Sequence, residues 1–292
     1  AIRQGERIML PRLLDIIRDA LELARGLGLG EDLEFYGIDI ADAFHNIPPR
    51  PDEKRFVCAM FDGVYYIFDV TIFGSRSSPT VWGRYGAWLG RSTSSLFRPT
   101  ELRIEVYVDD PLMVAAGTPE VRRRLFTVAL LWMAVAGFPL AWAKAERGEK
   151  VRWIGAEVAR TETGVDVLVP QDKAAELAQT SKQFLASNTI GVRQLRSYCG
   201  GVSFLAGLVP TFRPFLGMLW AVLSSTGVCS ASEGGPRSLT ASSKRQRTRG
   251  LPQHLIYTKQ CRLALLWLLA FFRRQRGALH RSFSTITPSM RW

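Results

Sequence analysis

Apolar positions in the first half of the chain follow a helical spacing once and a strand-like spacing several times. Between residues 10 and 27 they recur every three or four positions, which predicts an amphipathic helix. Pro79 and Pro119 suit the first turns of two further helices, expected at 78–90 and 119–136. The remaining apolar runs are short and end at turn residues, as antiparallel strands do; they lie at 35–40, 56–72, 104–116, 151–158 and 165–169.

From Pro170 onward the apolar spacing is helical. Helices are expected at 172–186, 192–208, 215–223 and 255–273. Residues between the last two are rich in Ser, Gly and Arg, a composition typical of a linker. The pattern therefore predicts four parts: a mixed α+β region at 1–169, a helical region at 170–223, a basic linker at 224–250, and a C-terminal helix and tail at 251–292.

One apolar run raises the alternative of a membrane-associated protein. Residues 125–143 contain no charged residue over 19 positions, which is long enough to cross a bilayer. Pro139 interrupts this run, and proline breaks a helix from within. We therefore expect a buried helix that ends near Ala136, and no membrane partner.

The composition points to a polyanionic partner. The net charge is +12, whereas 47% hydrophobic residues are ordinary for a globular core. A generally basic protein without such a partner is the alternative. The four cysteines form no CxxC pair and have no histidine at metal-ligand spacing, so neither zinc nor a disulfide framework is expected. A reducing intracellular compartment, cytoplasmic or nuclear, fits this cysteine usage.

Three aspartates occupy settings that suit chemistry. Asp39 ends an apolar strand, and Asp109 and Asp110 lie at the tip of an apolar hairpin. Carboxylates gathered at strand ends repel one another, and divalent cations relieve that repulsion. Oxygen ligands of this kind suit Mg²⁺ or Mn²⁺, and two ions about 3.5–4 Å apart can activate a 3′-hydroxyl and stabilise a leaving pyrophosphate. An ordinary Asp-Asp-Pro turn is the alternative for the hairpin alone.

Five short motifs follow one another at 37–48 (GIDIADAFHNIP), 73–79 (FGSRSSP), 107–110 (YVDD), 137–144 (GFPLAWAK) and 151–155 (VRWIG). In this order they resemble the motifs of reverse transcriptases, especially of tyrosine-recombinase (DIRS-like) retroelements. The segments 195–200 and 209–215 are similar to the thumb of the same family. Each motif alone is weak, and their order and spacing make the resemblance specific.

The resemblance implies an α+β polymerase palm with an antiparallel sheet and packed helices, truncated fingers, and an α-helical thumb. It implies RNA-directed DNA polymerase activity, with an RNA or DNA template, a DNA primer and deoxynucleoside triphosphates as partners. Two Mg²⁺ ions, or Mn²⁺, would be the cofactors. Asp39 and Asp109 would bind both ions, with Asp110 nearby and the Ile40 backbone helping to hold the first. Lys144 would be a general acid or charge stabiliser, or else a solvated surface lysine.

The same resemblance assigns residues to the two substrates. Phe44 would be the steric gate that crowds a ribose 2′-hydroxyl, and an ordinary core aromatic is its alternative. Gly74 would let the backbone approach the nucleotide. Ala43 and Phe73 complete the nucleotide-binding set, and Tyr107, Trp153 and Gly155 form the primer-binding set. Trp153 could instead be a core residue.

The chain departs from the family in two places. Only 38 residues precede Asp39, and residues 1–30 match only the last part of the fingers; Thr71 and Ile72 stand where the family has a proline before motif two. Residues 279–292 contain no acidic side chain, so no RNase H site is expected there. The basic run 244–249 could bind nucleic acid, act as a nuclear signal or be a solvated linker. A catalytically inactive nucleic-acid-binding remnant of a mobile element and, more remotely, an RNA polymerase of the viral palm type are the alternatives.

Overall fold

The computed structural model describes residues 8–75, 77–225, 254–274 and 278–283. The chain divides into two compact units. One contains the described residues up to Asp166 together with those from His280, and the other is Val167–Leu279. The mixed α+β fold with antiparallel sheets that the sequence predicts is confirmed.

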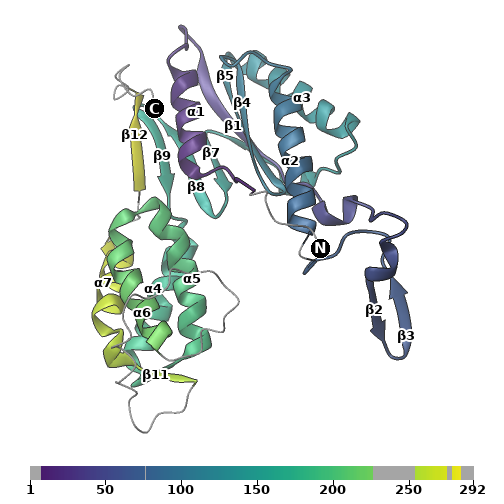
Figure 1. Cartoon of the computed structure of the whole chain (residues 1–292). Helices are drawn as coiled ribbons and strands as arrows, with labels where there is room; N and C mark the ends of the chain where they lie inside the picture. Colours follow the sequence, from purple (N-terminus) through teal and green to yellow (C-terminus); the bar gives the residue numbers. More distant parts are fainter. Residues whose placement is uncertain (1–7, 76, 226–253, 275–277, 284–292) are drawn as a thin grey trace. The chain divides into compact units, whose positions relative to one another are not determined.

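The first unit is built on a four-stranded antiparallel sheet with the order β4-β5-β1-β6 (Figure 1). Its strands are β1 (Asp32–Gly37), β4 (Leu102–Tyr107), β5 (Asp110–Gly117) and β6 (Glu146–Gly148). Every residue of β5 from Leu112 to Ala116 is buried, because helices cover both faces of the sheet at its centre. Because both faces of the strand are covered, residues 112–116 are apolar throughout and do not alternate with polar residues.

Alternate residues of β4 show which helix covers which face. Leu102 and Ile104 belong to the apolar core beneath α2 (Ser78–Ser94) and α3 (Pro119–Val135). Arg103, one position along, points to the opposite face, where its guanidinium donates to Glu22 of α1 (Leu13–Ala24) at 3.0 Å. The sheet is therefore a central layer, with α1 on one side and the α2–α3 pair on the other.

A carboxyl pair lies between α1 and β4. Asp19 is 5% exposed and shares a hydrogen bond with Glu105. Burial, followed by the charge of Asp19, raises the pKa of Glu105 to about 7. Glu105 in the folded protein therefore keeps its proton at pH values where Glu105 in the unfolded chain, with its ordinary pKa of 4.5, has already lost it. Stability from this pair is therefore present at pH 4.5 and lost as the pH rises through about 7.

Replacing Glu105 with glutamine is expected to stabilise the protein at pH 8 by about 1 kcal/mol, a value reduced for the partial exposure of the site. The amide can donate to Asp19 without losing a proton, so the gain should vanish at pH 5. Urea denaturation at the two pH values measures the difference. The exposed Glu53, changed in the same way, should shift neither midpoint. An equal gain at both pH values would contradict the shared proton.

The run 56–72 contains a hairpin of two short strands, β2 (Cys58–Phe61) and β3 (Val64–Ile67). Asp62 and Gly63 both have positive φ, 50° and 73°, as a two-residue Asp-Gly turn requires. All eight strand residues are exposed. Within the described residues, β2 and β3 pair only with each other. The hairpin turn predicted at Asp62-Gly63 is confirmed.

A second four-stranded sheet has the order β12-β9-β8-β7. Its strands are β7 (Lys150–Trp153), β8 (Ala156–Thr161), β9 (Gly164–Leu168) and β12 (Ala278–Ser282). The sequence predicts β9, but it predicts one strand at 151–158 where the structure has β7 and β8 joined by a turn at Ile154-Gly155, and it misses β12. His280 Nδ1 lies 2.5 Å from the Asp166 carboxylate, so a hydrogen bond helps to hold this strand beside β9.

The second unit is largely helical. Its elements are α4 (Gln171–Ala186), β10 (Thr189–Gly191), α5 (Val192–Leu208), α6 (Arg213–Ser225), β11 (Leu255–Tyr257) and α7 (Arg262–Arg274). The helix predicted at 255–273 is wrong at its start, because residues 255–257 pair with β10 as a strand. The expected linker 224–250 and its basic run 244–249 lie, apart from the end of α6, outside the described residues.

None of the helices in the described part of the chain is long and apolar enough to cross a membrane. The uncharged run 125–143 divides, as expected, into the end of α3 and a turn at Gly137, whose φ is 86°.

Candidate active site

The three aspartates meet where β1 and β5 place their ends at one edge of the sheet. Gly37 of β1 lies opposite Leu112 of β5, so Asp39 follows β1 just beside the start of β5. Two backbone bonds extend the pairing beyond the strands: Ile38 N–H donates to Pro111 at 3.2 Å and Ile40 N–H to Asp109 at 2.7 Å. The structure therefore brings Asp39 together with the Asp109-Asp110 hairpin, which is the arrangement that the sequence predicts.

Two buried tryptophans hold the tip of this hairpin. Val108 has a φ of 58°, a strained conformation for a β-branched residue. Trp82 of α2 donates its indole N–H to the Val108 carbonyl at 2.8 Å. Trp153 of β7 donates likewise to the Asp110 carbonyl at 2.9 Å. Both indoles are 1% exposed, so the turn that carries Asp109 is fixed from below on two sides.

The aspartates interact electrostatically. Burial raises the pKa of Asp110 to about 7, a backbone hydrogen bond with Ile154 lowers it, and the charges of Asp39, Asp109 and Glu146 raise it further. Burial also raises the pKa of Asp109. A backbone hydrogen bond acts to lower this pKa, and the charge of Asp39 acts to raise it. A cation near these carboxylates would lower both pKa values and stabilise the cluster.

Lys144 supplies the positive charge nearest to Asp39. It ends a short 3₁₀ segment (Trp142–Lys144), and its ammonium group forms an ion pair with the Asp39 carboxylate. Ala141 N–H donates to the Asp39 carbonyl at 2.8 Å and Ala41 N–H to Pro139 at 2.8 Å, so the two segments are joined. The hydrogen bond with Asp39, and then its charge, raise the pKa of Lys144. The lysine is therefore charged at neutral pH and is placed among the aspartates.

The donor set fits a hard divalent cation, because carboxylate oxygens are the ligands that Mg²⁺ prefers. Asp39 and Asp109 are the two best-placed donors, since the Asp110 carboxylate already accepts from the Ile154 backbone. Within the described residues, no group of three or more His, Cys, Asp or Glu side chains is already spaced as a metal cage. The Lys144 ammonium group must move away from Asp39 before a cation can bind both carboxylate oxygens of Asp39.

The candidate nucleotide residues lie beside this edge. Phe44 belongs to a 3₁₀ turn (Ala43–Asn46) that follows Asp39, and its ring packs edge-on against Phe73 at 5.1 Å and Trp82 at 6.4 Å. Phe73 is 70% exposed, and a Cβ added to Gly74, whose φ is 88°, would meet no atom within 4 Å. The side chain of Ala43 is buried, so only its backbone is available to a ligand.

The candidate primer residues fall on two hairpins. Tyr107 closes the β4–β5 turn opposite Asp110. Gly155 has a φ of 75° and forms the β7–β8 turn with Ile154. Trp153 is buried and bonds to Asp110, so the side chain acts on the position of that aspartate.

Comparison with known proteins bears on this geometry. Residues 25–158 match the family described as reverse transcriptase (RNA-dependent DNA polymerase). This part of the chain is therefore similar to a reverse transcriptase domain. It includes the Asp39 and Asp109-Asp110 edge and both supporting tryptophans. No curated protein sequence matches the chain.

Solved structures of foamy viral protease–reverse transcriptase share this fold. The complex with an RNA/DNA hybrid has a TM-score of 0.54 at 14% identity and covers 90% of this chain and 30% of its own. A variant of that enzyme with double-stranded DNA has a TM-score of 0.52 at 16% identity and covers 86% and 37%. The chain thus spans about a third of the length of these proteins. At such identities the likeness establishes the fold alone.

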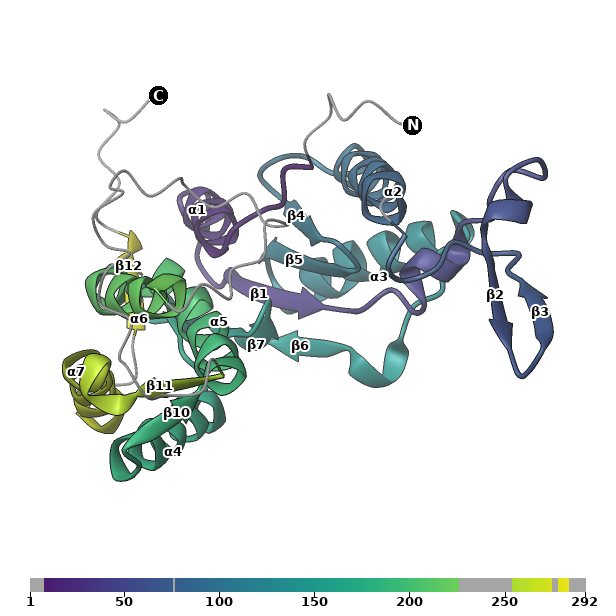
Figure 2. The same ribbon diagram turned by 60° about the horizontal axis from the view of Figure 1, so that its bottom comes forward.

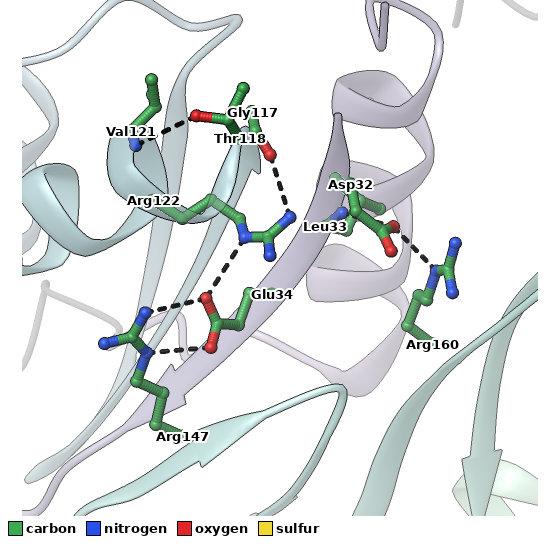
Figure 3. Close-up of polar contacts among 9 residues, drawn as sticks. All are labelled: Asp32, Leu33, Glu34, Gly117, Thr118, Val121, Arg122, Arg147 and Arg160. Atoms are coloured by element: carbon green, nitrogen blue, oxygen red, sulfur yellow. Dashed lines mark hydrogen bonds and ion pairs between the residues drawn. The ribbon is translucent and has the colours of Figure 1, made fainter. Parts of the chain in front are cut away.

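A charged cluster that the sequence does not reveal lies between β1 and α3 (Figure 3). Glu34 accepts from Arg147 at 2.8 and 3.1 Å and from Arg122 at 3.2 Å. Arg122 also donates to the Gly117 carbonyl at 2.9 Å. Since these partners lie on α3, β5 and β6, one carboxylate ties β1 to the elements that place Lys144 and Asp110.

Thr71 is a second residue whose role the sequence does not reveal. The Thr71 hydroxyl donates to the Phe44 carbonyl, and the Thr71 N–H donates to the Ile47 carbonyl at 2.9 Å. Thr71 therefore links the segment before Phe73 to the Phe44 turn. No local pattern in the sequence indicates this contact.

Proposed function

We propose that this chain is the core of an RNA-directed DNA polymerase, which transfers a deoxynucleotidyl group to a primer 3′-hydroxyl. The observation that carries the proposal is the meeting of Asp39, Asp109 and Asp110 at one edge of a reverse transcriptase domain, with Lys144 beside them. Template and primer are nucleic acid, as the net charge of +12 favours. The foamy viral enzymes, solved with RNA/DNA hybrid and double-stranded DNA, support the same partners.

Asp39 and Asp109 would hold two Mg²⁺ or Mn²⁺ ions, with the Ile40 backbone and Asp110 assisting. When bound, such ions lower the pKa of the primer hydroxyl and stabilise charge on the leaving phosphates. Lys144, charged and near these carboxylates, is suited to donate a proton to the leaving pyrophosphate. Trp82 and Trp153 position the aspartates through the hairpin backbone. Gly155 and Tyr107 would face the primer.

The proposal extends to the origin of the chain, a DIRS-like retrotransposon, and to an intracellular site of action, cytoplasmic or nuclear. A catalytically inactive, nucleic-acid-binding remnant is the second candidate. The ion pair between Lys144 and Asp39 favours it, because the lysine takes the place of a cation at one aspartate. The membrane-associated alternative has no support from the described helices.

Primer extension on an RNA template separates the two candidates. The chain should extend a DNA primer with deoxynucleotides and Mg²⁺, and a chelator should stop it. Binding of the primer–template with no extension, in Mg²⁺ or Mn²⁺, would instead identify the remnant.

Replacing Phe44 with valine is expected to raise the use of ribonucleotides relative to deoxynucleotides about tenfold, since a smaller side chain leaves room for the 2′-hydroxyl. The measured quantity is the ratio of kcat/KM for the two nucleotides. Phe61, an exposed phenylalanine on the β2–β3 hairpin, is the matched control, and its valine variant should keep the original ratio. An unchanged ratio in the Phe44 variant would remove the steric-gate role.

A further inference from the structure

The outer face of helices α2 and α3 is apolar and exposed. On α3, Val128, Leu131 and Val135 are 39%, 59% and 80% exposed, and on α2 Tyr85 and Trp88 are 47% and 44% exposed. The opposite side of α3 is also apolar and packs on the sheet through Leu125, Phe126, Ala129 and Met133. A helix that is apolar all round is normally covered on both sides. The exposed side of α3 therefore has the character of an interface.

The two helices lie side by side, and aromatic contacts join their exposed residues into one surface (Figures 1 and 2). The Trp88 ring lies 6.3 Å from Trp132 of α3, whose indole N–H donates to Ser92 at 3.1 Å. Trp88 also stacks on Phe138 at 6.1 Å and 22°. We call the surface formed by Tyr85, Trp88, Val128, Leu131, Trp132 and Val135 the α2–α3 face.

A cavity of about 460 Å³ opens at one end of this face. Trp82, Tyr85, Trp88 and Phe138 line it, together with Ile47 and Asn46. Its volume is in the range that encloses a bulky apolar group. A concave pocket beside an apolar helical surface suits a protruding side chain of a folded partner, which would anchor in it.

Charge restricts which partner can cover the face. The sequence has no acidic residue at 70–100 or at 121–145. Arg84 lines the cavity, Arg91 lies seven residues further along α2, and Arg123 and Arg124 are exposed at the start of α3. A second copy of the chain would bring two equally basic borders together, and these borders would repel each other. An acidic partner matches both the apolar centre and the basic border.

We propose that the α2–α3 face binds an acidic amphipathic helix of a partner protein. Its apolar side would lie along Val128, Leu131 and Val135 and place one large side chain in the cavity beside Trp88. Its acidic side chains would face the arginines. Helix-in-groove recognition of this kind reads apolar anchors at positions i, i+3 or i+4, and i+7. None of the six residues of the face belongs to the aspartate edge, although Trp82, which lines the cavity, also donates to the Val108 carbonyl.

A fluorescein-labelled synthetic peptide provides the test. The probe is a helix of about 18 residues, or five turns, with Leu and Trp at the anchor positions and Glu elsewhere. One control peptide replaces each Glu by Lys, and a second scrambles the order of the acidic probe. Fluorescence anisotropy with the full chain, without nucleic acid or nucleotide, should show binding of the acidic probe at least tenfold tighter than that of either control.

Leu131→Glu and Val135→Glu should each weaken this binding at least tenfold. Both side chains are exposed, so unchanged thermal melting should accompany the loss, and Val135, the more exposed, is decisive if the other variant melts early. Leu29→Glu adds the same charge at a fully exposed leucine outside the face and should bind normally. Equal binding of the scrambled peptide, or binding that both face variants retain, would overturn the proposal.

Two further outcomes would overturn it in favour of a different occupant. Sedimentation showing a dimer that Val135→Glu dissociates would assign the face to a second copy of the chain. Flotation with phosphatidylserine-containing vesicles that Leu131→Glu abolishes, in the absence of peptide binding, would assign it to a membrane surface.

Discussion

The Asp109→Asn variant is expected to lose primer extension by at least about 10³-fold. The two cations are held by the negative charge of the carboxylate, and the amide of asparagine is neutral. Asp109 is the residue for this test since its backbone fixes the register of the edge. Its carbonyl accepts from Ile40 N–H at 2.7 Å, and asparagine keeps that bond. The variant should therefore fold normally and bind primer–template as the parent does. Single-turnover extension and duplex binding, measured on the same samples, separate chemistry from binding.

A matched aspartate controls for the chemistry of the substitution. Asp62 lies at an exposed hairpin tip with a φ of 50°, and asparagine tolerates that conformation. Asp62→Asn should leave extension unchanged. Extension that survives in the Asp109 variant would exclude the proposed metal site. Loss of duplex binding together with extension would show that Asp109 acts through structure.

The edge that carries the aspartates could be predicted from the sequence because strand periodicity and turn residues are local. An apolar strand that ends at Asp39 and a hairpin that turns at Asp109 leave few ways to pair in an antiparallel sheet. What holds them there could not be predicted. Trp82 lies 26 residues from Val108, and Trp153 lies 43 residues from Asp110. Trp153 is expected from the sequence to position the primer or to be a core residue, and no sequence pattern singles out Trp82.

The errors in the helical part have the same origin. Residues 255–257 continue the apolar run of α7, so the sequence favours one long helix. Their strand conformation comes from pairing with Thr189–Gly191, more than sixty residues earlier. Tertiary pairing overrides local preference in such short segments. β12 is missed for a similar reason, since its partner β9 is more than a hundred residues away.

Charged side chains on the sheet were the least predictable feature. Glu34 alternates with buried residues along β1, a pattern that normally indicates a solvated face. In the structure it is 15% exposed at the side chain and accepts from two arginines that come from distant segments. Only the folded chain reveals that this carboxylate connects the strand before Asp39 to the strand after Lys144.

Replacing Glu34 with glutamine is expected to cost about 2 kcal/mol of stability at pH 7, because two partly buried guanidinium groups lose their counter-charge. Burial acts to raise the Glu34 pKa, but the hydrogen bonds and charges of Arg147 and Arg122 outweigh it, so the pKa is lowered. A lowered pKa gives stability that is present above the unfolded value of 4.5 and lost as the pH falls through the folded value. The deficit of the variant should therefore shrink below pH 4.5.

Urea denaturation at pH 7, 5 and 4 measures this deficit, with Glu162→Gln in the exposed β8–β9 turn as the matched control. The control should match the parent at every pH. A deficit of the Glu34 variant that is the same at pH 7 and pH 4 would mean that packing, rather than charge, is lost. Since Glu34 joins β1 to α3 and β6, the variant should also bind Mn²⁺ less tightly at the aspartate edge, although no metal ligand has been changed. Weaker Mn²⁺ binding with unaltered ligands would show that the ion cluster between β1 and α3 sets the spacing between Asp39 and the Asp109-Asp110 hairpin.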